Sequence, residues 1–226
     1  MRAFAWAGAT LFVVALLFFG WSYFGPFGHI APGPDRLGPL AIDVLLFSVF
    51  ALHHSVLART GAKAVVTRVV PGPVERATYV WIASLLFIAV CAWWQPVPGV
   101  LWRTEGATAW ALRALSIGGA WLTLHSAFML DMFELAGTRG FMAPRHDALK
   151  THGPYRLVRH PIYLAWLFLV WSPTTMNGTR LVFAVVSTAY LVIAIPFEER
   201  SLHASIGPAY AAYVARIRWR LVPFLY

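Results

Sequence analysis

The feature that most constrains this chain is the number and length of its apolar runs. A helix needs about 20 mostly apolar residues to cross a bilayer, within a range of roughly 17–25. Four runs meet this requirement, at residues 3–24, 39–58, 77–94 and 107–130. Two less regular runs follow a long polar stretch, at residues 161–172 and 181–197, with a turn between them. This pattern predicts an all-α, polytopic membrane bundle of five to six transmembrane helices, the last two forming a hairpin.

Composition excludes the other broad classes of protein. The 226 residues are 59% hydrophobic and only 12% charged, whereas soluble domains are about a quarter charged. A single cysteine, Cys91, excludes a disulfide scaffold. The net charge of +9 would suggest nucleic-acid binding in a soluble protein, but here the basic residues lie mostly in short loops between apolar runs. We therefore expect a membrane protein with no nucleic-acid partner.

The basic residues give the six runs one consistent orientation. Cytoplasmic loops of membrane proteins carry an excess of Lys and Arg. With six spans and the N-terminus inside, all but four of the 18 Lys and Arg residues fall on the cytoplasmic side. The exceptions are Arg36, Arg103, Arg113 and Arg180. We expect both termini to be cytoplasmic, and we expect the first run to be a span because it exceeds the roughly 7–15-residue core of a signal peptide.

Several ionisable side chains lie within or beside the predicted spans, where they are costly and often functional. His53 and His54 fall near the cytoplasmic end of the second run, and His125 and Asp131 near that of the fourth. Rather than acting in catalysis, each histidine could hydrogen-bond between helices or ligate haem. Adjacent histidines point about 100° apart on a helix, and no H-x-x-H cluster occurs, so we expect no metal site.

The polar stretch before residue 161 concentrates Gly, Pro, Tyr, Arg and His just ahead of an apolar helix. Pro161 suits a first helical turn, because its missing N–H is not needed there. Arg159 and His160 then lie at the helix start, where amide groups and the helix dipole favour an anion. A carboxylate or phosphate ligand is the physical expectation, although arginines here could instead anchor lipid headgroups.

Two adjacent carboxylates, Glu198 and Glu199, end the last apolar run at the same predicted interface. They could bind a cation, or one of them could form an ion pair with Arg159. Residues 207–220 then alternate aromatic residues with arginines, a pattern typical of an interfacial helix that closes over a site. S-adenosyl-L-methionine has a carboxylate, an ammonium, a sulfonium and a stackable adenine, so these features permit it as a ligand.

Motifs in the C-terminal third resemble those of the isoprenylcysteine carboxyl methyltransferase superfamily, which includes phospholipid N-methyltransferases. They are Gly-Pro-Tyr-Arg at 153–156, Arg-His-Pro at 159–161 with Tyr163, Glu-Glu at 198–199, and Gly207, Tyr210 and Tyr213. Further stretches resemble a narrower branch, the bacterial methanethiol S-methyltransferases. These are residues 52–59, 73–80, 94–96, 131–135 and 173–176.

The resemblance implies an enzyme of the bacterial inner membrane that uses S-adenosyl-L-methionine as its cofactor. It implies one domain over residues 1–226, with a four-helix membrane part at 1–130 and a cofactor-binding part at 131–226, whose site is cytoplasmic. The residues that would contact the cofactor are His152, Tyr155, Arg159, His160, Tyr163, Glu198 and Glu199. Arg159 or His160 would hold its carboxylate, and the two glutamates would face its ammonium or sulfonium end or orient Arg159.

The resemblance also implies that a small thiol, methanethiol, is methylated to dimethyl sulfide. A free thiol has a pKa of about 8.5 or higher, so a base would help form the thiolate. His54, His125 and Asp131 are candidates, by their predicted depth and chemistry alone. Three alternatives stay open: a prenylcysteine carboxylate or membrane lipid amine as acceptor, a non-catalytic haem- or quinone-binding membrane protein, and a role in nitrogen-oxide metabolism.

Overall fold

The computed structural model describes residues 1–57, 70–141 and 149–226, and these form two compact units. Within the described residues, unit 1 draws on Met1–Arg103, Met132–Pro144 and Thr175–Val186. Unit 2 draws on Thr104–Asp131, Arg145–Thr174 and Ser187–Tyr226. Four basic residues that the sequence places on the cytoplasmic side, Arg59, Lys63, Arg68 and Arg145, lie outside the described residues.

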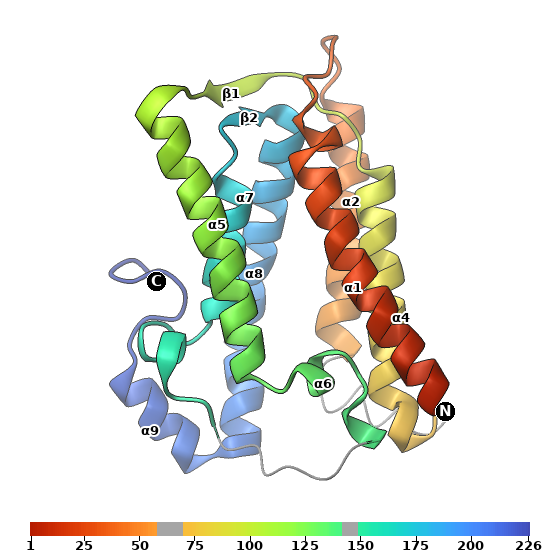
Figure 1. The fold of residues 1–226 in the computed structure, drawn as a ribbon, viewed down its shortest axis with the longest axis vertical. Coiled ribbons are helices and arrows are strands. Elements are labelled where there is room, and N and C mark those ends of the chain that lie inside the picture. The colour runs from red at the N-terminus through yellow and green to blue at the C-terminus, as the bar shows by residue number, and fades with distance from the viewer. Residues whose placement is uncertain (58–69, 142–148) are drawn as a thin grey trace. The chain divides into compact units, whose positions relative to one another are not determined.

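Unit 1 is built on three long helices, α1 (Arg2–Phe24), α2 (Leu37–Leu57) and α4 (Gly72–Trp93). Helix α4 packs against both α1 and α2 (Figure 1). It begins with proline in its first turn and carries Glu75 there. A carboxylate at this position interacts favourably with the positive end of the helix dipole. The short helices η1 (Pro26–Gly28), α6 (Met132–Leu135) and η2 (Arg139–Phe141) complete the unit.

An aromatic cluster forms the core of unit 1 around Phe183. The ring of Phe183 lies 5.0 Å from that of Trp94 and 5.4 Å from those of Phe19 and Tyr23, centroid to centroid. The rings of Phe27 and Phe47 lie within 6 Å of it as well. Such tilted and edge-to-face pairs add to the stabilisation that comes from burying the rings.

A short two-stranded ribbon corrects the all-α expectation. Strand β1 (Val100–Arg103) pairs antiparallel with β2 (Thr175–Asn177), with Val100 opposite Asn177 and Arg103 opposite Thr175. The sequence predicts only a turn at β2, because three residues are too few to show an alternating pattern. The pairing depends on a partner strand more than 70 residues away, which a local pattern does not reveal.

Asn177 and Arg180 join the start of helix α8 (Gly178–Ile206) to η1 and to the end of α1, respectively. The Asn177 amide donates to the carbonyls of Phe27 and His29, both at 2.8 Å, and its oxygen accepts from the Arg180 backbone N–H. The Arg180 guanidinium donates to the carbonyls of Tyr23 and Phe24. These carbonyls lie at the negative end of the α1 dipole, so the positive charge of Arg180 interacts favourably with it.

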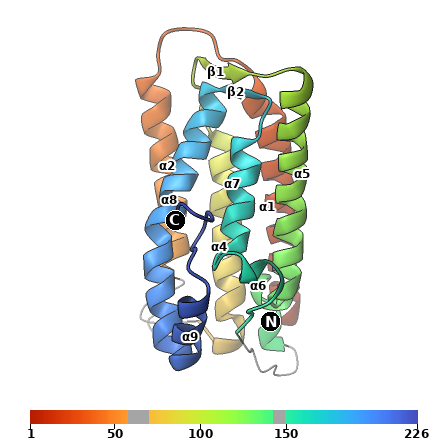
Figure 2. The same cartoon turned by 90° about the vertical axis from the view of Figure 1, so that its left-hand side faces the viewer.

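Unit 2 contains α5 (Gly106–Met129), η3 (Gly153–Arg156), α7 (Pro161–Trp171) and α9 (Pro208–Arg216), together with α8 beyond Val186. Helix α5 packs on α7 at Gly119, where an added Cβ would lie 2.9 Å from the Ala165 carbonyl oxygen. Helix α7 runs beside α8 (Figure 2), and the indole N–H of Trp166 donates to the Ser187 hydroxyl.

Helix α8 is longer than the apolar run that predicts it. The run ends at residue 197, but the helix continues to Ile206 and has Pro196 in its interior. Glu198 and Glu199 therefore lie within the helix. Because side chains on successive helical residues point about 100° apart, the two carboxylates face different surroundings.

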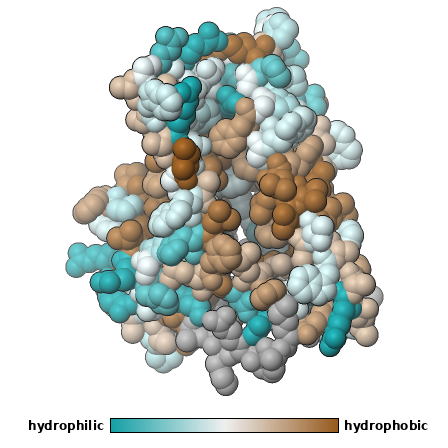
Figure 3. Space-filling model, viewed as in Figure 1, coloured by the Kyte–Doolittle hydropathy of each residue, from teal (hydrophilic) through white to brown (hydrophobic). Residues whose placement is uncertain are grey.

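Four helical stretches of the described chain are long and apolar enough to cross a membrane. They are Arg2–Gly28, Leu37–Ser55, Gly72–Trp93 and Gly178–Ile206. Helix α5 occupies the fourth predicted run but is not among them, and α7 is apolar but has only 11 residues. Exposed apolar side chains such as Leu17 and Ile193 line the spans, and Figure 3 shows apolar side chains at the surface of the face that it draws. The chain is thus mostly helical and integral to the membrane, with the higher count of five to six crossings still a prediction.

Replacing Asn177 by alanine should destabilise unit 1. The change leaves two carbonyls and one N–H without their buried partner, and each such loss costs about 1–3 kcal/mol. We expect a clearly lower thermal unfolding midpoint in detergent. Gln95→Ala is the matched control, because that amide makes an exposed hydrogen bond, and it should shift stability by less than about 0.5 kcal/mol. Equal midpoints for the two variants would contradict this role.

Candidate active site

The residues just before α7 are hydrogen-bonded to the chain's own C-terminal segment, residues 217–226. The backbone N–H of Arg159 donates to the Trp219 carbonyl and that of His160 to the Arg220 carbonyl, both at 2.9 Å. The sequence predicts an anion at this helix start, where amide groups favour one. In the structure the amide groups of Arg159 and His160 already donate to backbone carbonyls of the C-terminal segment.

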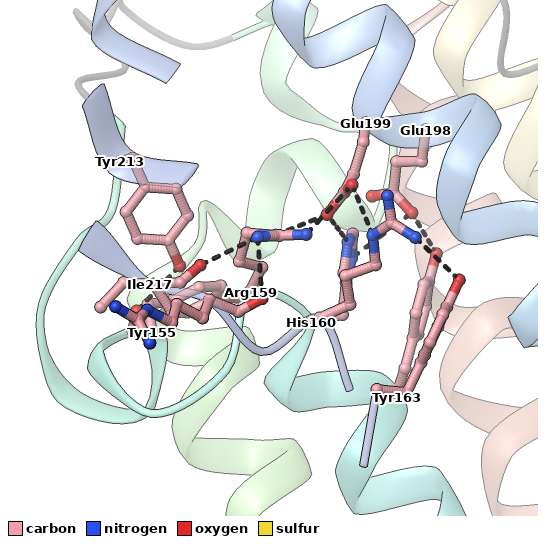
Figure 4. Close-up of polar contacts among 11 residues, drawn as sticks. Tyr155, Arg159, His160, Tyr163, Glu198, Glu199, Tyr213 and Ile217 are labelled. Atoms are coloured by element: carbon pink, nitrogen blue, oxygen red, sulfur yellow. Dashed lines mark hydrogen bonds and ion pairs between the residues drawn. The ribbon is translucent and has the colours of Figure 1, made fainter. Parts of the chain in front are cut away.

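Glu199 is the centre of the site (Figure 4). Its carboxylate accepts from Arg159 Nε at 2.6 Å and Nη2 at 3.3 Å, and from Arg220 Nε at 3.0 Å. His160 Nε2 lies 3.3 Å away. Glu199 is only 6% exposed, so one buried carboxylate joins α8, the start of α7 and the C-terminal segment. We call these four residues the Glu199 cluster.

All three side-chain nitrogen atoms of Arg159 donate hydrogen bonds. Besides its two bonds to Glu199, its Nη1 atom donates to the carbonyls of Ile217 at 2.9 Å and Arg218 at 3.2 Å. The side chain is buried, and a buried guanidinium is tolerated only when it is paired and hydrogen-bonded. Of the alternatives that the sequence leaves open for the two glutamates, an ion pair with Arg159 is the one the structure shows for Glu199.

Glu198 has different surroundings. Its side chain is 41% exposed, and it accepts a 2.7 Å hydrogen bond from the Tyr163 hydroxyl. His160 Nδ1 lies 3.8 Å from it, and the rings of His160 and Tyr163 stack with centroids 5.3 Å apart. The site thus holds one neutralised carboxylate inside and one half-exposed carboxylate at its surface.

Buried tyrosines attach α9 to this site. The Tyr213 hydroxyl donates to the Tyr155 carbonyl at 2.8 Å, and Tyr210, Tyr213 and Ile217 pack together. Burial raises the pKa of Tyr213 to about 12, and it also raises the pKa values of Tyr155 and Tyr210. All three hydroxyls are therefore neutral at physiological pH.

Two other predicted site residues of unit 2 lie near the 153–163 motif. His152 is exposed at the start of η3. His125 is exposed on α5 and stacks on Trp121, with ring centroids 5.0 Å apart. A Cβ built on Gly153, which has a φ of +59°, would lie 3.7 Å from His125 Nε2. That distance is an ordinary contact, so the loop lies beside the histidine, whereas the same Cβ would come within 2.7 Å of Met129 Sδ.

The remaining candidates lie elsewhere. Asp131 is buried just beyond the end of α5 in unit 2. His54 belongs to unit 1, where its Nδ1 atom is 2.8 Å from the Tyr79 hydroxyl. His53 stacks on the same tyrosine, with ring centroids 5.5 Å apart. The structure groups His54 with unit 1 and the other predicted residues with unit 2.

Sequence reasoning missed Arg220 and Tyr226. It predicts a single interfacial helix over residues 207–220, but α9 ends at Arg216 and the chain continues without helical structure, with a turn near its end. Arg220 turns toward Glu199, and its Nη1 atom donates to the Tyr226 hydroxyl at 3.3 Å. Arginines at 216, 218 and 220 look alike in the sequence, so no local signal singles out the one that enters the site.

Glu199→Gln should destabilise the protein far more than Glu198→Gln. Removing the charge of Glu199 leaves Arg159 buried without its counter-ion, and breaking such a pair costs about 3–5 kcal/mol. Glu198 is half exposed, so the same change there should cost less than about 1 kcal/mol. Thermal unfolding in detergent measures both, and similar losses for the two variants would argue against Glu199 as the centre of the cluster.

Comparison with known proteins places the chain among methyltransferases. The profile described as "PEMT: Phospholipid methyltransferase" matches residues 108–207, a range that holds both glutamates and the 153–163 motif. Methanethiol S-methyltransferase 2 of Bradyrhizobium diazoefficiens is 36% identical over 222 residues, which cover 95% of this chain and 85% of that protein. Methanethiol S-methyltransferase of Mycobacterium tuberculosis is 38% identical over 185 residues, 77% of this chain and 74% of that protein.

Nurim of Pan troglodytes is also similar, at 31% identity over 198 residues, 77% of this chain and 73% of nurim. No solved structure matches the chain. The methyltransferase relatives cover most of both chains, and the profile covers the predicted cofactor-binding residues. This chain belongs to the family of membrane methyltransferases that includes the methanethiol S-methyltransferases.

Proposed function

We propose that the chain transfers a methyl group from S-adenosyl-L-methionine to a small thiol, methanethiol, giving dimethyl sulfide. The observation that carries the donor side of the proposal is the half-exposed carboxylate of Glu198, which lies beside the buried ion pair of Glu199 and Arg159. Such a carboxylate favours a cationic ligand, and this donor has both a sulfonium and an ammonium. The names of the bacterial relatives support methanethiol as the acceptor.

The residues present fit such a donor. Tyr163 holds Glu198 by a 2.7 Å hydrogen bond, so the carboxylate is oriented before a ligand arrives. The stacked rings of His160 and Tyr163 give a flat surface next to it. When bound, the donor supplies a methyl group on a positively charged sulfur. The chain's own contribution is to bind it, align it with the thiol and exclude water.

The acceptor side needs a base that removes the thiol proton. We propose His125 for this role, because within unit 2 it is exposed and adjacent to the loop that leads into the Arg159 motif. A neutral imidazole accepts the proton and leaves the thiolate to attack the methyl carbon along the axis of the departing sulfur. His54 and Asp131 remain predicted alternatives for this base.

Labelled methyl transfer in a sealed vial tests the proposed reaction. Purified protein in detergent, given methyl-labelled S-adenosylmethionine and methanethiol, should release labelled dimethyl sulfide into the headspace. Glu198→Gln should raise the KM for the donor about tenfold, as expected for a lost charge-assisted contact. His125→Gln should lower kcat with the donor affinity unchanged. No product from the folded wild-type protein would sink the thiol assignment.

A phospholipid amine is the second candidate acceptor, and the family profile is the observation that favours it. The same donor site would serve, since only the nucleophile changes. Phosphatidylethanolamine vesicles in place of methanethiol distinguish the two candidates. Label recovered in lipid and none in the headspace would make the lipid amine the acceptor.

We also propose that the site faces the cytoplasm of a bacterial inner membrane and that, of the predicted five to six transmembrane helices, six cross it, which puts both termini inside. The excess of Lys and Arg in the loops of that side supports this orientation. A fluorescent protein that folds only in the cytoplasm, fused after Tyr226, should fluoresce in cells. The matched fusion to a reporter active only in the periplasm should be silent, and the reverse pattern would overturn the orientation.

A further inference from the structure

The residues that the sequence assigns to the donor's carboxylate are already occupied. Arg159 is 9% exposed and makes four hydrogen bonds, two to Glu199 and two to carbonyls of the C-terminal segment. His160 is similarly buried, with its backbone N–H on the Arg220 carbonyl and its ring on Glu199. A ligand carboxylate there would have to displace bonds that hold the site together.

Arg220 is the exposed cation of the cluster. Its side chain is 37% exposed, against 6% for those of Arg159 and His160. Glu199 accepts from its Nε atom and Tyr226 from its Nη1 atom. Within residues 1–57, 70–141 and 149–226, no hydrogen bond uses its Nη2 atom. The guanidinium is therefore held through its Nε and Nη1 atoms, and its Nη2 atom retains two N–H donors.

This arrangement suits recognition of a carboxylate. A guanidinium presents paired N–H groups in a plane that matches two carboxylate oxygens. Because Glu199 and Tyr226 fix its position, Arg220 loses little side-chain freedom when a ligand binds. Glu198, next to Glu199 on α8, is the half-exposed anion of the same site. An exposed cation and an exposed anion together match the two charges of an amino acid.

Building on the donor site proposed above, we propose that Arg220 binds the carboxylate of the methyl donor's amino-acid end. Arg159 then acts as a positioning residue, which holds Glu199 and the C-terminal segment so that Arg220 is presented to the ligand. Arg220 lies beyond the range that the family profile matches, so this contact comes from the C-terminal segment.

Two related ligands test this assignment without any catalysis. S-adenosylhomocysteine carries the amino-acid end, whereas 5′-methylthioadenosine keeps the nucleoside and thioether but lacks the carboxylate and ammonium. Calorimetry on the full chain in detergent measures both affinities. Arg220→Gln should weaken S-adenosylhomocysteine about 10- to 100-fold, as expected for lost charge-assisted hydrogen bonds. It should change the affinity for 5′-methylthioadenosine less than about twofold.

Arg200→Gln is the matched control, because it removes the same charge from an exposed side chain that stacks on Phe197. It should leave both affinities unchanged. Arg220→Lys keeps the charge near Glu199 but loses the planar fork, so it should show the same selective loss if Arg220→Gln fails to fold. Equal losses for both ligands would mean that Arg220 only holds the segment in place and would overturn the proposal, as would no loss for either. Failure of the wild-type protein to bind either ligand would instead overturn the donor site itself.

Discussion

The site depends on one buried carboxylate. Glu199 meets Arg159 from the loop before α7 and Arg220 from the C-terminal segment, so three stretches far apart in the sequence meet at two oxygen atoms. Taking a charge out of water costs several kcal/mol unless partners surround it. Because the partners come from separate segments, satisfying Glu199 fixes where each segment lies. The half-exposed Glu198 then has a defined place beside the cluster.

The two adjacent glutamates differ in their surroundings, because Glu199 is buried in ion pairs whereas Glu198 is half exposed. A buried ion pair whose hydrogen-bonding groups all have partners is a poor ligand site, since a ligand must first break strong bonds. It can instead hold neighbouring side chains in place, because its geometry is specific. The exposed members of the site, Glu198 and Arg220, are the ones that can exchange water for a ligand at low cost. Rigid support for a few accessible charges is the arrangement expected of a preorganised binding site.

Much of the helical framework could be predicted from the sequence because hydropathy is a local property. The run at 161–172 corresponds to α7 (Pro161–Trp171), and the run at 3–24 corresponds to α1 (Arg2–Phe24). The β1–β2 ribbon could not be predicted, because each strand is defined only by its distant partner. The extension of α8 past residue 197 was missed for another reason: its polar residues end the apolar pattern although the helix continues.

The candidate site, like the fold, could be predicted from the sequence only in part. The motifs identify Arg159, His160, Tyr163 and the two glutamates as residues that belong together, and hydrogen bonds link them in the structure. Their separate roles depend on burial, which spacing does not show. Arg220 lies among several similar arginines, so only its contact with Glu199 distinguishes it.

The central claim is that a methyl donor binds where α7, α8 and the C-terminal segment meet. Hydrogen–deuterium exchange of the purified protein, with and without S-adenosylhomocysteine, tests it most directly. If the donor binds there, residues 153–163 and 217–226 should exchange more slowly when the ligand is present. Unchanged exchange in both segments, with protection confined to other parts of the chain, would contradict it.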